Sequence, residues 1–260
     1  MLRFSANVSV LFNEVELTQR FMLARHYGFN EVEIQFPYAY TAEQLKALLD
    51  EQQLHLVLFN VAAADLLKGG EGLAAVPQLR DQFQAAVDQA VHYAEILKPS
   101  AINVLPGRCL TPQRLPEYLE TLSANLAYAV KAFAPLGIKT VFEAINTFDM
   151  PGFIIHSSQQ MLNLLELMQL PNLYMQYDVY HMQRMGDNSA AFIMQHASKI
   201  GHIQFADVPG RGQPGTGHLD FSAIFAAIAA SGYQGWVGAE YHPQGQTADS
   251  FYSWLTHKEI

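Results

Sequence analysis

The chain has 260 residues, half of them apolar, and it carries 24 Asp and Glu against 15 Lys and Arg, for a formal charge of −9. This acidic balance argues against a nucleic-acid partner, because phosphate binding depends on clustered Lys and Arg, and it favours a small-molecule partner. No stretch approaches the roughly 18 to 20 uninterrupted apolar residues of a membrane helix, so no membrane partner is expected. The N-terminus lacks an export signal and Cys109 is the only cysteine, so we expect a cytoplasmic protein without disulfides.

The first half of the chain alternates between short apolar runs with strand character and longer segments with helical periodicity. The predicted strands lie at 4–11, 31–36, 55–60 and 101–105, and the predicted helices at 14–27, 41–50, 77–97 and 112–133. Gly28 is expected to end the first helix. Thr41 with Gln44 forms the capping-box pattern that starts the second. The long segment 61–76, which contains the glycine cluster 69–72, is typical of a functional loop or a lid.

The second half continues this alternation. The predicted strands lie at 140–143, 174–178, 200–205 and 237–241, and the predicted helices at 157–168, 189–197, 221–230 and 247–255. Ser157 or Ser158 is expected to cap the first of these helices. Eight strand and helix units in roughly 250 residues predict an α/β fold, a closed (β/α)8 TIM barrel, whereas an open doubly wound sheet usually stops at five or six strands. No repeat or linker interrupts the pattern, so we expect a single domain over residues 1–260.

The last four predicted strands each carry a side chain with an oxygen donor at or next to their end: Glu143, Asp178, Gln204 and Glu240. Catalytic groups of such barrels sit at the carboxyl ends of the strands, so these side chains should meet. A single acid at a strand end is equally well explained as a helix cap or an ion-pair partner, since buried carboxylates need partners. Three converging carboxylates, however, would repel one another without a cation. We therefore predict that the four side chains bind one divalent metal, and oxygen ligands suit Mg²⁺ or Mn²⁺.

Three further side chains are candidates for contact with a substrate. His181 follows Asp178 by three residues into the same predicted loop; a solitary His is more often a core or surface residue, but this placement favours substrate contact. Arg211 lies among turn residues just beyond Gln204, where it is either an ordinary solvated residue or a bidentate clamp for a substrate carboxylate. Asp149 is a candidate for contact with a hydroxyl, although turn formation explains it nearly as well.

Six motifs follow one another in order along nearly the whole chain. They are FSAN at 4–7, EAIN at 143–146, QYDVYHMQ at 176–183, GHIQ at 201–204, PGTG at 214–217 and GYQGWVGAEY at 232–241. This set resembles the hydroxypyruvate isomerase family of xylose-isomerase-like barrels, which also contains the 2-oxo-tetronate isomerases. Such a match is far more specific than a single short motif.

The resemblance implies roles for particular residues. The family's metal-ligand positions correspond to Glu143, Asp178, Gln204 and Glu240. Glu143 and Glu240 would double as the catalytic acid and base. Related ketose epimerases hold substrate oxygens with a His at the position of His181 and an Arg near that of Arg211.

Two positions depart from the family pattern. Leu79 stands where the family usually has an Arg, and His218 replaces a customary Glu after the Gly-Thr-Gly turn. Both are expected near the barrel mouth, where they would affect substrate choice. They leave the predicted metal site intact.

The resemblance implies an intramolecular oxidoreductase that interconverts hydroxypyruvate and tartronate semialdehyde by metal-assisted proton transfer through an enediolate. A 2-oxo-tetronate isomerase or a ketose epimerase with the same site is the open alternative. Less favoured are a metal-dependent abasic-site endonuclease, which would bring more His ligands and a basic groove, and a barrel that binds a sugar acid without turning it over. The sequence leaves the oligomeric state open, a homo-oligomer included.

Overall fold

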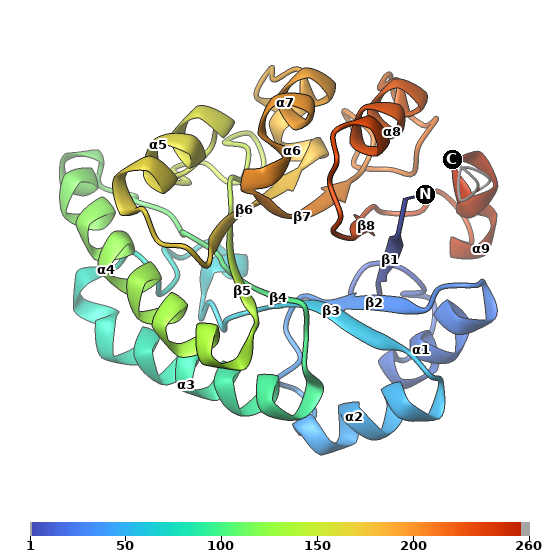
Figure 1. Cartoon of the computed structure of the whole chain (residues 1–260), viewed down its shortest axis with the longest axis horizontal. Helices are drawn as coiled ribbons and strands as arrows, with labels where there is room; N and C mark the ends of the chain where they lie inside the picture. The colour runs from blue at the N-terminus through green and yellow to red at the C-terminus, as the bar shows by residue number, and fades with distance from the viewer. Residues whose placement is uncertain (1, 256–260) are drawn as a thin grey trace.

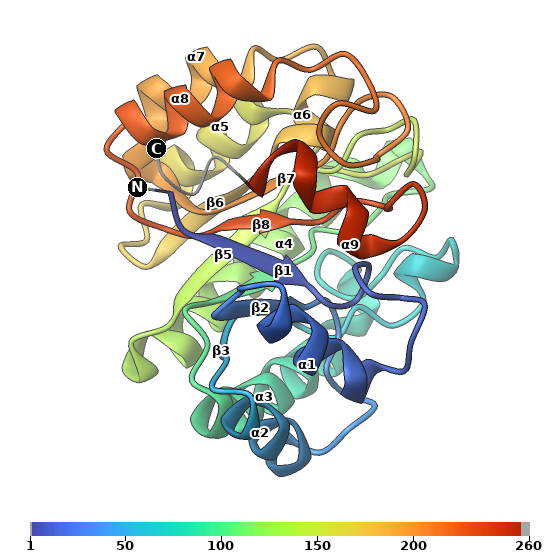
Figure 2. The same ribbon diagram turned by 90° about the vertical axis from the view of Figure 1, so that its right-hand side faces the viewer.

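The strands form a closed parallel barrel. The computed structural model describes residues 2–255, and its strands follow one another around the barrel in chain order (Figure 1). They are β1 (Phe4–Asn7), β2 (Glu31–Ile34), β3 (His55–Asn60), β4 (Ala101–Val104), β5 (Lys139–Glu143), β6 (Leu173–Asp178), β7 (Ile200–Phe205) and β8 (Val237–Ala239). Pairing of β1 with both β2 and β8 closes the barrel, and Figure 2 shows β1 and β8 side by side. The predicted (β/α)8 barrel is therefore confirmed.

The helices lie outside the strands and cover them (Figures 1 and 2). The α-helices are α1 (Leu17–His26), α2 (Ala42–Glu51), α3 (Arg80–Leu97), α4 (Leu115–Phe133), α5 (Ser158–Met168), α6 (Val179–Arg184), α7 (Ser189–His196), α8 (Phe221–Ala230) and α9 (Thr247–Ser250). Short 3₁₀ helices lie at Leu66–Lys68, Pro77–Leu79, Pro112–Arg114, Ala134–Leu136, Ala197–Lys199 and Phe251–Ser253. In α4, apolar residues three and four apart, such as Leu122, Leu126 and Ala129, turn one face inward and are buried.

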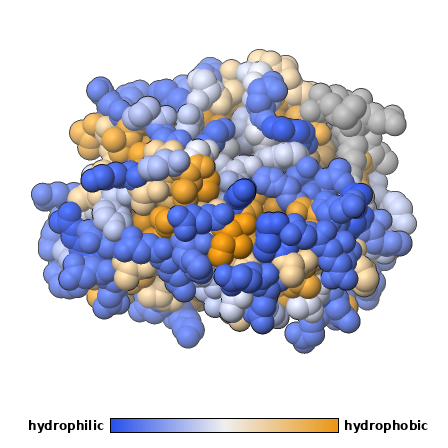
Figure 3. All heavy atoms as spheres, turned by 60° about the horizontal axis from the view of Figure 1, so that its bottom comes forward, coloured by the Kyte–Doolittle hydropathy of each residue, from blue (hydrophilic) through white to orange (hydrophobic). Residues whose placement is uncertain are grey.

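The outer surface is largely polar. On the face shown in Figure 3, hydrophilic residues predominate and apolar residues form small separate patches. None of the helices in the described part of the chain is long and apolar enough to cross a membrane.

An aromatic cluster joins the end of the chain to its beginning. The ring centroid of Trp254 lies 5.1 Å from that of Phe4 on β1 and 5.0 Å from that of Phe205 on β7. Both pairs meet edge to face, an arrangement that aromatic quadrupoles favour. Trp254 is fully buried, so the segment after β8 packs against the barrel although α9 spans only four residues.

The capping signals of the sequence act as predicted. Thr41 and Gln44 form a complete capping box at the start of α2, and Ser157 caps α5 by accepting a hydrogen bond from the Gln160 backbone. Gly28 follows α1 with φ +88°, a left-handed conformation that favours glycine.

Four predicted strands and one predicted helix are too long; among the strands, β2 ends at Ile34 rather than at residue 36, and β4 at Val104 rather than at residue 105. β1 ends at Asn7 rather than at residue 11, because Asn7 accepts hydrogen bonds from the backbone of Ser9 and Leu11 and turns the chain. β8 ends at Ala239, and the predicted helix 247–255 divides into α9 and a 3₁₀ turn. The predicted domain also includes residues 1 and 256–260, which lie outside the described residues.

The helix α6 was not predicted. Asp178 ends β6 and caps this helix, because its carboxylate accepts hydrogen bonds from the backbone of Tyr180 and His181. His181 therefore lies on the first turn of a helix and not in a loop, as the sequence had suggested. The helix fixes its position relative to Asp178.

Replacing Gly238 by Ala should destabilise the barrel. Gly238 lies on β8, and a methyl group there would overlap Oε1 of the buried Glu33. The Glu33 carboxylate cannot move away without losing hydrogen bonds from Ser5 (2.6 Å) and His202 (2.8 Å). We expect a loss of about 1 to 3 kcal/mol in the free energy of unfolding, measured by urea denaturation. Gly210→Ala is the control, because an added methyl group there meets no atom within 4 Å; equal stabilities would show that Glu33 adapts freely.

Candidate active site

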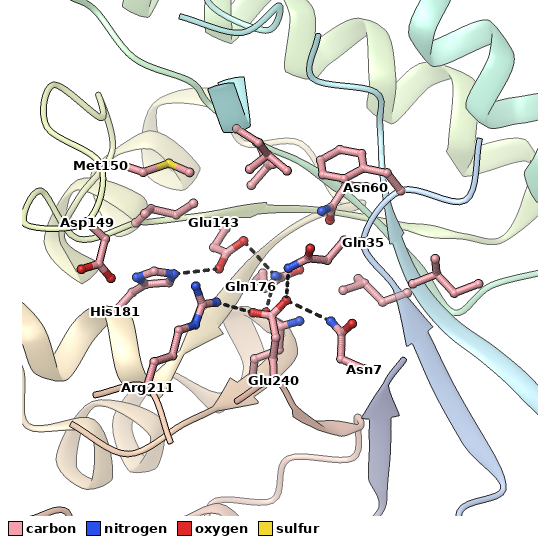
Figure 4. Close-up of a pocket in the computed structure, with 17 residues that line it drawn as sticks. Asn7, Gln35, Asn60, Glu143, Asp149, Met150, Gln176, His181, Arg211 and Glu240 are labelled. Atoms are coloured by element: carbon pink, nitrogen blue, oxygen red, sulfur yellow. Dashed lines mark hydrogen bonds and ion pairs between the residues drawn. The ribbon is translucent and has the colours of Figure 1, made fainter. Parts of the chain in front are cut away.

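A pocket of about 140 Å³ opens inside the barrel at the carboxyl ends of the strands (Figure 4). Six of the seven predicted site residues line it: Glu143, Asp149, His181, Gln204, Arg211 and Glu240. The seventh, Asp178, is fully buried and lies 3.7 Å from the His181 ring. Apolar side chains, among them Phe36, Leu105 and Met150, complete the lining. The predicted site residues therefore lie together at the carboxyl ends of the strands, where catalytic groups of such barrels are found.

Glu143, the last residue of β5, has one engaged and one free oxygen. Its Oε2 accepts hydrogen bonds from Asn103 (3.1 Å) and Gln176 (3.0 Å). Its Oε1 accepts none from the described residues and lies 4.0 Å from Nε2 of His181. Burial raises the pKa of Glu143 well above its usual range, and the charges of the other pocket acids raise it further. Glu143 is thus suited to take up and release a proton.

Glu240 follows β8 and reaches the same pocket with both oxygens engaged. Its Oε1 accepts hydrogen bonds from Asn7 (2.9 Å) and Gln35 (2.8 Å), and its Oε2 accepts one from Arg211 (2.7 Å). Figure 4 shows these donors converging on the carboxylate. The two glutamates therefore have unlike surroundings, because Glu143 keeps a free oxygen and Glu240 is held by three donors, one of them charged.

Asp178 carries a buried oxygen that lacks a partner. Its Oδ1 accepts a hydrogen bond of 2.7 Å from the Tyr180 backbone, while its Oδ2 accepts none from residues 2–255. This Oδ2 lies 3.7 Å from Nε2 of His181 and 3.8 Å from the Arg211 guanidinium. Burial raises the pKa of Asp178 to about 7, although Arg211 opposes the shift. A buried, unpartnered carboxylate oxygen is a place where a cation would be stabilised.

The donor set fits a divalent metal. One donor atom each from Glu143, Asp178 and His181 lies within 4.8 Å of the others, and all three side chains are buried. Carboxylate oxygens are suitable ligands for Mg²⁺ or Mn²⁺. Gln204 and Glu240 line the same pocket, but their oxygens accept hydrogen bonds from protein side chains. One metal shared by the four predicted ligands therefore stays a prediction.

Gln204 is held in a directional chain of hydrogen bonds. Its Nε2 donates to Glu33 (2.8 Å), which is fully buried on β2. Its Oε1 accepts from Gln176 (2.7 Å), and Gln176 in turn donates to Glu143. Because the Glu33 carboxylate only accepts, it sets the orientation of Gln204 and, through it, that of Gln176. A donor is thereby held against Glu143.

His181 and Asp149 lie on neighbouring elements at one side of the pocket. His181 is buried on α6, and burial followed by the charge of Arg211 lowers its pKa well below the usual range, so the ring is neutral. Asp149, in the loop after β5, accepts hydrogen bonds from Asn146 (2.9 Å) and the Tyr180 hydroxyl (2.8 Å). Both line the pocket, so contact with a substrate stays a prediction for each.

Arg211 reaches the pocket from the loop after β7. Its guanidinium lies 5.3 Å from the centre of the Tyr180 ring, a cation–π arrangement, and donates to Glu240. The buried Asp207 organises this loop by accepting hydrogen bonds from the backbone N–H groups of four loop residues. Arg211 therefore projects from a loop that is ordered before any substrate arrives.

The amides of the first four strands were missed. Each of these strands carries one such side chain at or next to its end: Asn7, Gln35, Asn60 and Asn103. Three of them also line the pocket, and Asn103 binds Glu143. The sequence could have revealed these amides. The rule that places functional groups at the carboxyl ends of barrel strands applies to carboxamides on the first four strands as well as to acids on the last four.

The predicted functional loop 61–76 contributes Leu67 to the pocket. The carboxylate of Glu71 ties this loop down, because it accepts hydrogen bonds from the Leu110 backbone (2.8 Å) and the Tyr118 hydroxyl (2.8 Å). The loop therefore contributes to the wall of the pocket, and its predicted functional role stays a prediction. Closure as a lid stays a prediction.

The two departures from the family pattern are not among the residues that line the pocket. Leu79 ends a 3₁₀ helix and packs against the core, and His218 donates its backbone N–H to the Val208 carbonyl (3.1 Å). An effect of either residue on substrate choice stays a prediction.

Comparison with known proteins gives consistent matches. A family model described as "Xylose isomerase-like TIM barrel" matches residues 21–257. The hydroxypyruvate isomerase of Escherichia coli (strain K12) is 42% identical over 247 residues, which cover 95% of this chain and 96% of that protein. A 2-oxo-tetronate isomerase of Pectobacterium atrosepticum is 37% identical over 249 residues, or 96% of this chain and 95% of that protein.

Solved structures agree on the fold. A Brucella melitensis protein described as "AP endonuclease, family 2" superposes with a TM-score of 0.95 and 35% identity over 99% of both chains. A D-allulose 3-epimerase from Methylomonas sp. has a TM-score of 0.79 at 18% identity, covering 100% of this chain and 98% of that one, and shares the fold. The chain therefore belongs to the xylose isomerase-like TIM barrel family, and within it to the hydroxypyruvate isomerase family of isomerases.

Proposed function

We propose that this isomerase interconverts hydroxypyruvate and tartronate semialdehyde. The observation that carries the proposal is the pair of buried glutamates with unlike surroundings, Glu143 with a free oxygen and Glu240 with none. Proton transfer between adjacent carbons needs a group that can exchange a proton beside a polar environment that stabilises the resulting charge. The relative from Escherichia coli, named hydroxypyruvate isomerase, supports the choice of substrate. A small hydroxy-oxo acid also suits a pocket of about 140 Å³.

In the proposed reaction, a proton leaves C3 of hydroxypyruvate and a proton is returned to C2, while a hydroxyl proton passes between the two oxygens. Oε1 of Glu143 is free to take the proton from carbon, and Glu240 lies across the pocket to return or shuttle one. Arg211 and His181 place N–H groups beside the acids, where they would stabilise the enediolate oxygens and hold the substrate. Each positioned acid or base contributes about 10²- to 10⁴-fold to the rate.

A divalent cation belongs to the proposal. Glu143, Asp178, Gln204 and Glu240 would hold it, and when bound it supplies positive charge that stabilises the enediolate. The Gln204 oxygen accepts one hydrogen bond, from Gln176, and its second lone pair would be the one to face a cation. The unpartnered Oδ2 of Asp178 supports this assignment most directly.

Two alternative reactions would use the same site residues. The relative named 2-oxo-tetronate isomerase supports a four-carbon sugar acid as substrate, and a ketose epimerase would use the same acids. The values of kcat/KM across a panel of oxo acids and ketoses distinguish these substrates. Cleavage of abasic DNA, suggested by the description of the Brucella protein, is disfavoured by the net charge of −9. A barrel that only binds its ligand predicts no exchange of carbon-bound hydrogen with D₂O.

Replacing Glu143 or Glu240 by Gln should leave a folded barrel with kcat lowered by about 10²- to 10⁴-fold. NMR detection of solvent deuterium entering hydroxypyruvate measures the proton transfer, and circular dichroism checks the fold. Glu166→Gln is the control, because Glu166 is exposed and forms a surface ion pair with Lys199. Near-normal exchange in the Glu143 or Glu240 variant would mean that the residue is not an acid or base of the reaction.

The proposed metal should stabilise the protein more as the pH rises. Glu143 and Asp178 have raised pKa values in the folded state, so between about pH 4 and 7 the folded chain keeps protons that the unfolded chain releases. Without metal, the stability from these groups is present at low pH and falls with rising pH, by up to about 1.4 kcal/mol per pH unit for each group. A metal that replaces these protons binds better at higher pH.

Thermal denaturation with EDTA or Mn²⁺ measures this effect. We expect a larger rise in Tm with Mn²⁺ at pH 7.5 than at pH 5. Asp178→Asn should lose both the response to Mn²⁺ and part of the fall in stability with pH in EDTA. An equal response of Asp178→Asn and the unchanged protein would remove Asp178 from the metal site.

A further inference from the structure

The side-chain amide of Asn146 has an orientation that its surroundings determine. Asn146 is fully buried in the loop after β5. Its Oδ1 accepts hydrogen bonds from the backbone N–H groups of Phe148 (3.1 Å) and Asp149 (2.9 Å). Its Nδ2 then faces the Asp149 carboxylate at 2.9 Å and the Nδ1 atom of His181 at 2.7 Å. A flipped amide would place its oxygen against the carboxylate and its NH₂ group against two N–H donors, so the flip is excluded.

The orientation of this amide decides which nitrogen of His181 carries the proton. The Nδ2 group can only donate, and the backbone N–H of Asn146 also points at Nδ1, at 3.4 Å. Nδ1 must therefore accept a hydrogen bond. A proton on Nδ1 would face only donors and would find no acceptor. A neutral imidazole that accepts at one nitrogen carries its proton on the other.

We infer that Asn146 is a positioning residue that fixes His181 as the Nε2–H tautomer, so that the ring presents a hydrogen-bond donor, and not a metal ligand, to the pocket. Nε2 lies 3.7 Å from Oδ2 of Asp178 and 4.0 Å from Oε1 of Glu143, too far for a direct hydrogen bond to either. The N–H group is therefore available for an oxygen of a bound molecule.

This tautomer changes the interpretation of Glu143, Asp178 and His181, whose potential metal-ligand atoms lie close together. A metal needs the lone pair of an imidazole nitrogen, and here the Nε2 lone pair is replaced by a proton. A cation in the pocket would then be held by the proposed ligands Glu143, Asp178, Gln204 and Glu240, with His181 beside it. The donation to a substrate oxygen rests on the proposed function, whereas the tautomer of the free protein does not.

The tautomer can be measured directly in the free protein with ¹⁵N-labelled histidine. Long-range ¹H–¹⁵N correlation spectra distinguish a protonated from an unprotonated ring nitrogen, and the His181→Asn variant identifies the resonances of His181. We expect Nδ1 to be unprotonated and Nε2 to be protonated, with no change when Mg²⁺ is added. A protonated Nδ1, or loss of the Nε2 proton on adding Mg²⁺, would overturn the inference.

Exchanging donor and acceptor tests the part played by Asn146. The double variant Asn146→Asp, Asp149→Asn keeps the net charge and the hydrogen bond between the two positions, but it places an acceptor against His181. We expect Nδ1 to become protonated in this variant. Asn188→Asp is the control, because Asn188 is exposed at the start of α7 and its side chain needs only an acceptor there; it should leave the His181 spectrum unchanged.

The outcomes separate the tautomer from the proposed function. An unprotonated Nδ1 in the double variant would show that Asn146 does not set the tautomer. If the double variant fails to fold, the spectrum of the unchanged protein still decides whether His181 is a donor. A correct tautomer in a protein that does not turn over hydroxypyruvate would refute the proposed function only, and turnover by a protein with protonated Nδ1 would refute the inference only.

Discussion

The convergence of carboxylates at one end of the barrel is the constraint on which the rest of the site depends. Glu143, Asp178 and Glu240 are all buried, and like charges at close range in such a medium are unfavourable unless donors or cations compensate them. Part of the compensation comes from the same half, through Gln176 and Arg211, and part from the opposite half of the barrel: Asn7 at the end of β1 binds Glu240, and Asn103 on β4 binds Glu143. Strands β5 to β8 thus supply these three acids, and β1 and β4 supply neutral amide donors to two of them. The two halves of the chain are therefore complementary in chemistry as well as in packing.

Amide side chains pass a fixed hydrogen-bond direction from one residue to the next, because each has a donor end and an acceptor end. The buried Glu33 carboxylate orients Gln204, which orients Gln176, which donates to Glu143. Asn146 works in the same way, although two backbone N–H groups anchor it in place of a carboxylate. Each chain starts at a group that can only accept or only donate. Each chain thus sets which kind of hydrogen-bonding group meets the residue at its far end, Glu143 in one case and His181 in the other.

The sequence predicted the barrel and the meeting of its strand-end acids, since both follow from periodicity and from the common direction of parallel strands. It did not predict α6, because six residues are too few for a helical period to be recognised and the capping role of Asp178 is visible only once β6 is placed. The amide donors were also missed, because Asn at a strand end is equally typical of a turn and neutral amides do not stand out as acids do. Nor could the sequence show that Leu79 and His218 are not among the residues that line the pocket, since this depends on how the loops fold back over the barrel.

The acids of the loops and those of the pocket differ in the hydrogen-bond donors that their carboxylates meet. Asp207 is satisfied by four backbone N–H groups of its own loop, and Glu71 by a backbone N–H and a tyrosine hydroxyl of neighbouring elements. Such partners are part of the main chain or packed against it, so these acids hold the loops in one conformation. In the pocket, Glu143 and Glu240 are held by side-chain donors and Asp178 by the backbone of α6, and two oxygens, Oε1 of Glu143 and Oδ2 of Asp178, accept no hydrogen bond from residues 2–255. Those two oxygens can therefore meet a cation or a substrate without the loss of an existing hydrogen bond.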